Sequence, residues 1–460
     1  MRISHLAGVI GVAAIVLAGC GSGEESARMA APASDQSASV EAGLVGEAAP
    51  AANAEPQSDS SDEAQPSESA SAMPSESSSS SEAEVSTSLA PEGEPWVVSL
   101  GDSYISGEGG RWAGNQTWST GAIDALGPDA YHDNGSKEAI KGCHRSTSAA
   151  IHIGDVQSAN LACSGAKVAT VVNSDGTFKP GIDFYDKNGN KGQALMLEEF
   201  ASQNRVGMIA MSIGGNDFKF APLFAACVKA YLEPSVFGAY CQNDETVRGY
   251  VDEAATQRVR AGIKDSILNV ATAMENAGYQ DSQWTIGMQL YPSVLADASQ
   301  MRYPESGYNR QLEGGCGFRD KDADWAINTV LPMINETIRN AVNDAKQERP
   351  GLQAFVLDTS QAFDGHSLCN KTVHRVKEKG GANNWQDADA VDKSEWVMEV
   401  NMVNARDTYG QESLHPNYWG QLALRSCWRQ AWNGGDVRGG TCLPAGKGLS
   451  GLGEPKMSLS

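Results

Sequence analysis

Short apolar runs separated by longer amphipathic segments organise the chain after residue 95. The runs cover residues 96–100, 206–213, 284–291 and 353–358, and their lengths suit buried strands. Residues 252–276 instead place apolar side chains three and four positions apart, which is typical of one face of a helix. We therefore predict four strands and, between the second and the third of them, a long helix.

Two further segments complete this pattern. Residues 322–347 show the same helical spacing but contain Pro332, which lacks a backbone N–H, so we expect a kink or a division into two helices there. A last helix is expected over residues 418–432. Strands that alternate with long helices predict a parallel sheet covered on both faces, which is a three-layer α/β/α domain.

Three polar, glycine-rich segments interrupt the pattern at residues 108–142, 171–192 and 293–320. We expect them to be long loops, and loops of that length in a compact domain are usually functional. Their aromatic side chains either line an apolar substrate cleft or pack locally; these are Trp112, Trp118, Tyr131, Tyr303 and Tyr308.

The first 20 residues have the pattern of a secretion signal. Arg2 precedes an apolar stretch, and Leu17-Ala18-Gly19-Cys20 has the small residues before a cysteine that suit lipoprotein processing. We expect Cys20 to become an acylated N-terminus that anchors the protein in a membrane. The alternatives are a cleaved signal with an incidental cysteine and a single uncleaved span, for which the stretch is short because a span needs about 20 residues.

Residues 21–95 consist largely of Ser, Ala, Glu and Pro and contain no aromatic residue. Such a composition cannot bury enough apolar surface to fold, so we expect a disordered linker. The linker holds 15 acidic residues and one basic residue, and therefore carries −14 of the chain's net charge of −22. We predict that a folded domain over residues 96–445 follows it, and that residues 446–460 form a flexible tail.

The remaining charge and the cysteines limit the possible functions. The folded part has no basic cluster, which argues against nucleic-acid binding. Apart from Cys20 the chain has eight cysteines, an even number that suits disulfide bonds in an oxidising compartment, although many pairings are possible. No Cys-x-x-Cys or His-Glu-x-x-His spacing occurs, so we predict neither a metal site nor a cofactor.

Three short motifs carry a hydroxyl, an amide and an imidazole that such a sheet can bring together. Gly101-Asp102-Ser103-Tyr104 follows the first strand, Gly214-Gly215-Asn216-Asp217 follows the second, and Glu412-Ser413-Leu414-His415-Pro416 precedes the last helix. Side chains just past parallel strands gather at the carboxyl edge of the sheet, where such folds bind ligands. These groups suit acyl transfer, with Ser103 as nucleophile, His415 as base and Asn216 as oxyanion donor.

Glu412 lies three residues before His415, so one short loop carries both the base and a carboxylate. A carboxylate on the second ring nitrogen fixes the tautomer of a catalytic histidine and stabilises its protonated form. We therefore predict a triad of Ser103, His415 and Glu412. Each motif alone also suits a surface turn, because Gly, Asp and Ser favour turns, but the order of the motifs and their placement after apolar runs favour catalysis.

The motifs resemble those of the GDSL/SGNH hydrolases. Gly101-Asp102-Ser103-Tyr104-Ile105-Ser106-Gly107, Cys143-His144-Arg145-Ser146 and Phe363-Asp364-Gly365-His366-Ser367-Leu368-Cys369 are similar to the secreted actinobacterial branch of that family, which includes the Streptomyces scabies esterase and related lipases. The resemblance covers about residues 95–445. It implies the α/β/α fold of the family and the hydrolysis of carboxylic esters.

The resemblance also implies a second oxyanion donor, the backbone N–H of Gly165. Nearest-neighbour pairing of the cysteines agrees with the three disulfide bonds that the resemblance implies, and the same rule supplies a fourth; the pairs are Cys143 with Cys163, Cys227 with Cys241, Cys316 with Cys369, and Cys427 with Cys442. The family commonly has Asp where this chain has Glu412, and in the scabies esterase a backbone carbonyl takes that role. Either group is therefore a candidate to orient His415.

Together these features predict a lipid-anchored serine esterase or lipase on the outer face of the cell membrane, acting as a monomer on acyl esters of lipids. One alternative keeps the same residues but removes acyl groups from envelope polysaccharide. Another is a wall-binding protein without turnover, against which the four catalytic positions argue. Arg145 is expected to form a structural ion pair, and His152, His366 and His374 lack a catalytic motif.

Overall fold

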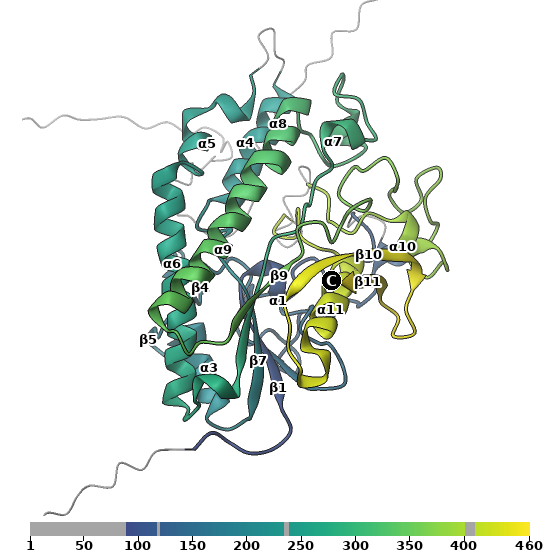
Figure 1. The fold of residues 1–460 in the computed structure, drawn as a ribbon. Coiled ribbons are helices and arrows are strands. Elements are labelled where there is room, and N and C mark those ends of the chain that lie inside the picture. The colour runs from purple at the N-terminus through teal and green to yellow at the C-terminus, as the bar shows by residue number, and fades with distance from the viewer. Residues whose placement is uncertain (1–88, 117–119, 234–238, 401–409) are drawn as a thin grey trace, which may run out of the picture. The chain divides into compact units, whose positions relative to one another are not determined.

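The computed structural model describes residues 89–116, 120–233, 239–400 and 410–460 (Figure 1). The expected signal segment, the anchor at Cys20 and nearly all of the linker lie outside the described residues, as does Trp118. Within the described ranges, none of the helices combines the length and the apolar character needed to cross a membrane.

One large sheet forms the centre of the domain. Its strands are β1 (Trp96–Gly101), β2 (Gln157–Asn160), β7 (Val206–Ser212), β8 (Thr285–Gln289), β9 (Ala354–Asp358), β10 (Gly440–Leu449) and β11 (Pro455–Leu459). Their order is β11-β10-β9-β8-β7-β1-β2, and neighbours run parallel except β10 and β11. The four strands predicted from the apolar runs are confirmed as β1, β7, β8 and β9.

Helices cover both faces of this sheet. The described helices are α1 (Ser103–Ser106), α2 (Thr120–Ile123), α3 (Gln193–Ala201), α4 (Phe220–Leu232), α5 (Glu245–Gly249), α6 (Glu253–Asn276), α7 (Asn309–Leu312), α8 (Asp320–Trp325), α9 (Leu331–Glu348), α10 (Ala390–Lys393) and α11 (Tyr418–Trp432). In Figure 1, α3, α6 and α9 lie on one side of the sheet and α11 on the other. The predicted three-layer α/β/α class is confirmed, with a mostly parallel sheet that has one antiparallel edge strand.

Smaller elements occupy the connecting segments. Two short hairpins pair β3 (Val171–Val172) with β4 (Phe178–Lys179) and β5 (Asp186–Lys187) with β6 (Asn190–Lys191). Single helical turns are η1 (Cys241–Asn243), η2 (Asp281–Gln283), η3 (Ala298–Gln300), η4 (Ala326–Val330) and η5 (Asn433–Gly435).

The amphipathic segments form the helices that their spacing predicts. Asp252 begins α6 because its carboxylate accepts a hydrogen bond from the N–H of Ala255, one of the free donors of the first turn. The second segment is not divided into two separate helices: α8 passes without a gap into the π-helical turn η4 and then into α9, and Pro332 lies in the first turn of α9. Proline cannot donate the hydrogen bond that a continuous α-helix requires at this position.

The eight domain cysteines form the four predicted disulfide bonds, which join Cys143 to Cys163, Cys227 to Cys241, Cys316 to Cys369, and Cys427 to Cys442. The last bond connects α11 to β10. It therefore holds the C-terminal hairpin to the helix that follows the histidine loop.

The C-terminal residues 446–460 are not a flexible tail, so that expectation is wrong. They complete β10 and form β11, and β10 extends the sheet beyond β9. Pro455, Met457 and Leu459 are buried and alternate with exposed side chains. This two-residue period is typical of a strand with one covered face, and in the sequence it is masked by the glycine-rich turn before it.

Candidate active site

Ser103 begins α1 immediately after β1. Gly101 turns the chain there with a φ of +129°, and a Cβ at this residue would lie 2.0 Å from the carbonyl oxygen of Ser212, so only glycine fits. Asp102 caps the short helix by accepting a hydrogen bond of 3.1 Å from the N–H of Tyr104. The turn places Ser103 at the carboxyl edge of the sheet, as the sequence predicts.

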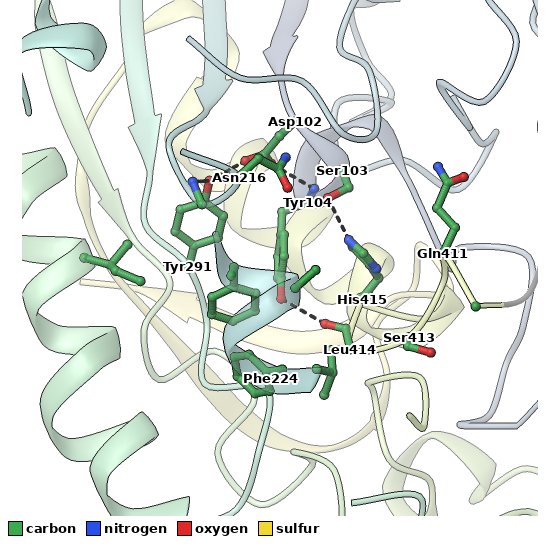
Figure 2. Close-up of a pocket in the computed structure, with 15 residues that line it drawn as sticks. Asp102, Ser103, Tyr104, Asn216, Phe224, Tyr291, Gln411, Ser413, Leu414 and His415 are labelled. Carbon is green, nitrogen blue, oxygen red and sulfur yellow. Dashed lines mark hydrogen bonds between the residues drawn. The ribbon is translucent and has the colours of Figure 1, made fainter. Parts of the chain in front are cut away.

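His415 contacts the Ser103 hydroxyl from a distant part of the chain. The distance between Ser103 Oγ and His415 Nε2 is 2.6 Å (Figure 2). Leu414, which has a left-handed φ of +63°, precedes the histidine, and its carbonyl accepts a hydrogen bond of 2.9 Å from the Tyr104 hydroxyl. The nucleophile helix therefore holds the histidine loop directly, and the predicted nucleophile and base meet.

Asn216 and Gly165 lie on two loops that are tied together. Asn216 lines the same cavity as Ser103 and His415. Its side-chain amide donates a hydrogen bond of 2.8 Å to the carbonyl of Ala166, which fixes the orientation of the amide. Gly165 directly precedes Ala166 in the sequence and has a φ of +84°. It follows β2, the strand that pairs with β1. Asn216 thus lines the cavity beside Ser103, whereas Gly165 lies on the neighbouring loop and is not among the residues that line the cavity.

A buried tyrosine connects the nucleophile turn to the Asn216 loop. The Tyr291 hydroxyl donates a hydrogen bond to Asp102 and accepts one of 2.9 Å from the N–H of Gly215. Burial raises the pKa of Asp102 to about 7, against the hydrogen bonds from Tyr291 and Tyr104. Tyr291 follows β8 without a motif of its own, so its position in the site is not evident from the sequence.

The cavity beside Ser103 is narrow and largely apolar. Its volume is about 50 Å³. Phe220 and Phe224 from α4, Ile334 from α9, and Leu414 line it (Figure 2). A small apolar space next to a nucleophile suits the acyl part of an ester better than a charged group, because burying an unpaired charge is costly.

The loop aromatics do not line this cavity, so the cleft that the sequence suggests is formed by other residues. Trp112 and Tyr131 both donate hydrogen bonds to Glu412. Tyr303 and Tyr308 also lie outside the set of residues around the cavity. The apolar walls come from helices, where aromatic residues at helical spacing look like ordinary core positions in the sequence.

The Glu412 carboxylate has no hydrogen bond to the imidazole of His415, which corrects the predicted triad; only the backbone carbonyl of Glu412 contacts His415, by accepting a hydrogen bond of 3.2 Å from its N–H. Its carboxylate accepts hydrogen bonds of 2.7 Å from Trp112 and 2.5 Å from Tyr131. Nδ1 of His415 has no hydrogen-bond partner among the described residues. Burial and the nearby charge of Glu108 raise the pKa of Glu412 to about 8, so this carboxyl is largely uncharged at neutral pH.

The surroundings of His415 favour its neutral form. Burial lowers the pKa of this histidine, while the charge of Glu108 and the nearby backbone carbonyls of Glu412 and Ser413 oppose that decrease. A neutral imidazole is the form that accepts a proton from Ser103.

Replacing Glu412 with glutamine is expected to keep kcat within about tenfold of the wild-type value. A carboxylate that fixes the histidine tautomer costs about 10⁴-fold when it becomes an amide, but Glu412 bonds Trp112 and Tyr131 instead. Steady-state kinetics on a soluble ester tests this, with thermal unfolding as a check because a buried donor can lose its acceptor. A loss near 10⁴-fold in a normally folded variant would return Glu412 to the triad.

The other polar residues named from the sequence lie away from the cavity. Arg145 donates to the carbonyl of Ala162 and pairs with Asp133 at 3.1 Å, so its predicted structural role is confirmed. His152 contacts Ser158, and neither His366 nor His374 lines the cavity.

Two residues that the sequence analysis left aside do belong to the site. Gln411 lines the cavity, and its amide donates to Glu108 at 3.0 Å and to the Ser164 hydroxyl at 2.9 Å. Glu108 stands in the stretch Gly107-Glu108-Gly109-Gly110, directly after the nucleophile motif. A single carboxylate in a glycine-rich segment is the one indication in the sequence of a special position.

No family model and no curated protein match this chain. Among solved structures, it is similar to an extracellular lipase from Streptomyces rimosus, with 17% identity, 71% of this chain and 94% of the other covered, and a TM-score of 0.35. It is also similar to a phospholipase A1 from Streptomyces albidoflavus NA297, with 17% identity, 74% of this chain and 99% of the other covered, and a TM-score of 0.38. A carbohydrate acetylesterase from Sinorhizobium meliloti shares 10% identity, with 61% of this chain and 91% of the other covered, and a TM-score of 0.26. TM-scores this low do not establish that the chain is related to these proteins.

Proposed function

We propose that the protein is a serine-dependent carboxylic ester hydrolase. The observation that carries the proposal is the 2.6 Å contact between Ser103 Oγ and His415 Nε2 at the edge of a small apolar cavity. A hydroxyl, a neutral imidazole and an amide around one cavity are the parts that acyl transfer needs. The resemblance of the motifs to the GDSL/SGNH hydrolases supports the same activity.

The reaction proceeds in two acyl transfers. His415 Nε2 takes the Ser103 proton while Oγ attacks the ester carbonyl carbon, and the carbonyl oxygen becomes an oxyanion near Asn216 and Gly165. The C–O bond to the alcohol then breaks, and the imidazolium returns its proton to the leaving oxygen. Water repeats the sequence on the acyl-enzyme, which releases the carboxylic acid and restores Ser103.

The lining of the cavity supports a lipid ester as the first candidate substrate. Phe220, Phe224 and Ile334 offer only apolar contacts to an acyl chain. The volume of the cavity supports a second candidate function, the deacylation of envelope polysaccharide. About 50 Å³ is small beside the roughly 150 Å³ of an engineered apolar cavity that accepts benzene, and a cavity of this size suits an acetyl group.

The location proposed for this activity is the outer face of the cell membrane. The motif Leu17-Ala18-Gly19-Cys20 supports lipid anchoring at Cys20. The acidic linker of residues 21–95 is long enough to act as a tether of on the order of 50 Å between the anchor and the domain. Four disulfide bonds support an oxidising compartment.

Turnover of p-nitrophenyl esters from acetyl to palmitoyl by the purified full chain tests the proposal. We expect hydrolysis that a fluorophosphonate stops by modifying Ser103, since such reagents trap the activated serine. Activity that persists to palmitoyl supports a lipid ester, and activity confined to acetyl supports the polysaccharide. If no ester is hydrolysed and the fluorophosphonate does not label Ser103, the enzyme proposal fails and the wall-binding alternative remains.

A further inference from the structure

The segment that carries the buried carboxylate of Glu108 lies between the nucleophile and the base. Glu108 is 0% exposed, and its backbone N–H donates a hydrogen bond of 3.3 Å to the carbonyl of Ser103. The next residue, Gly109, packs against the histidine: a Cβ at Gly109 would lie 3.3 Å from the Cβ of His415. The segment that carries Glu108 therefore contacts both members of the Ser103–His415 pair.

Two side chains hold this carboxylate in place. Both of its oxygens lie 2.8 Å from Nδ1 of His144, and one also accepts a hydrogen bond of 3.0 Å from Gln411. The ring of His144 stacks on Tyr131 with 4.4 Å between ring centroids. A buried carboxylate is tolerated when it is paired and hydrogen-bonded, and this one has a cation and an amide as partners.

The charge of His144 keeps the carboxylate of Glu108 ionised. Burial would raise its pKa, but the charge of His144 and its hydrogen bonds outweigh burial and lower the pKa to about 2. Burial would likewise lower the pKa of His144, but Glu108 raises it to about 9. Among the other titratable groups in the described surroundings of His415, His144 lowers the pKa of His415 and so opposes Glu108; the rest are Asp102, Tyr104, Tyr291 and Glu412.

We propose that Glu108 is a positioning residue for His415: held by His144 and Gln411, it supplies the buried negative charge that stabilises the protonated imidazole during turnover. It does so in place of Glu412, whose carboxylate bonds Trp112 and Tyr131. The inference rests on the proposed esterase function. It also gives the Cys143–Ser146 segment a role, because this segment supplies the cation that keeps Glu108 ionised.

The pH dependence of kcat/KM separates this role from a structural one. Glu108→Gln removes the charge that favours protonated His415, so the pKa of His415 falls. The acid limb of the kcat/KM profile should then move to lower pH by about one unit, and the plateau value of kcat/KM should fall about tenfold. His144→Gln removes a cation that lowers the pKa of His415, so the acid limb of that variant moves to higher pH, in the direction opposite to that of Glu108→Gln.

Glu138→Gln is the matched control. Glu138 lies 3.7 Å from Nε2 of His144 and also raises the pKa of that histidine, but Glu108 at 2.8 Å from Nδ1 keeps the imidazole charged, so the removal of Glu138 should leave the limb in place.

Circular dichroism and fluorophosphonate labelling identify folded variants. If Glu108→Gln does not fold, Glu108→Asp replaces it: this variant keeps the charge and should keep the acid limb of the wild type, and a folded Glu108→Asp protein whose limb moves as far as one unit would contradict the proposal. Unmoved limbs in folded, active Glu108→Gln and His144→Gln proteins overturn the proposal. A wild-type chain without serine-dependent turnover would instead refute the esterase function itself.

Discussion

Ser103→Ala is expected to lower kcat for ester hydrolysis by about 10⁶-fold, the size of effect seen when the serine nucleophile is removed from a Ser-His-Asp triad. Alanine cannot form the acyl-enzyme, and among the described residues Ser103 is the one whose hydroxyl is hydrogen-bonded to the His415 imidazole. The assay is initial-rate hydrolysis of a short p-nitrophenyl ester by the purified full chain, with active-site titration to set the limit of detection.

The fold should be unaffected by this change. The hydroxyl of Ser103 bonds only His415 among the described hydrogen bonds, and alanine is compatible with the first turn of α1. Ser106→Ala is the matched control, because it removes a hydroxyl from the same helix whose contacts, 3.3 Å to Ser103 O and 3.4 Å to His144 O, do not reach the base. Turnover by a folded Ser103→Ala protein would disprove the mechanism.

Asn216→Ala should reduce kcat by roughly 10²–10³-fold with a much smaller change in KM. An oxyanion donor acts on charge that develops in the transition state, so its loss slows turnover more than it weakens substrate binding. Steady-state kinetics on the same short ester gives both constants.

Asn269→Ala controls for the loss of an asparagine side chain. Asn269 on α6 donates a hydrogen bond of 2.9 Å to the carbonyl of Ile182, much as Asn216 donates one of 2.8 Å to Ala166. It lies outside the residues that line the cavity, and its replacement should leave kcat unchanged. If Asn216→Ala raised KM at constant kcat, Asn216 would be a binding residue and not an oxyanion donor.

The elements of the fold were predictable because their patterns are local. Each element buries side chains with its own period, so the pattern can be read within a single segment of the sequence. This holds for the apolar runs that form β1, β7, β8 and β9 and for the apolar stripe of α6. The C-terminal hairpin was missed because a strand that adds to a sheet edge depends on the partner strand it finds. Its own two-residue period is only five residues long.

The meeting of the groups proposed for catalysis was predictable for a different reason. A parallel sheet brings the ends of its strands to one edge, so Ser103 after β1 and Asn216 after β7 meet whatever the loops do. His415 could be named because its loop directly precedes α11. The partner of its second ring nitrogen could not be named, since three-residue spacing says that Glu412 is near His415 but not which way its side chain points.

The sequence by itself determined the fold class, suggested the four disulfide pairs through the resemblance and nearest-neighbour spacing, and proposed Ser103, Asn216 and His415 as the nucleophile, the oxyanion donor and the base. The tertiary structure decided which carboxylates carry charge near the base. Glu108 and Glu412 lie about 300 residues apart in sequence, and both are buried beside the same histidine loop. Only the folded arrangement gives one of them the His144 cation and the other two neutral donors. Burial makes that difference in partners large, because the protein interior screens charges far less than water does.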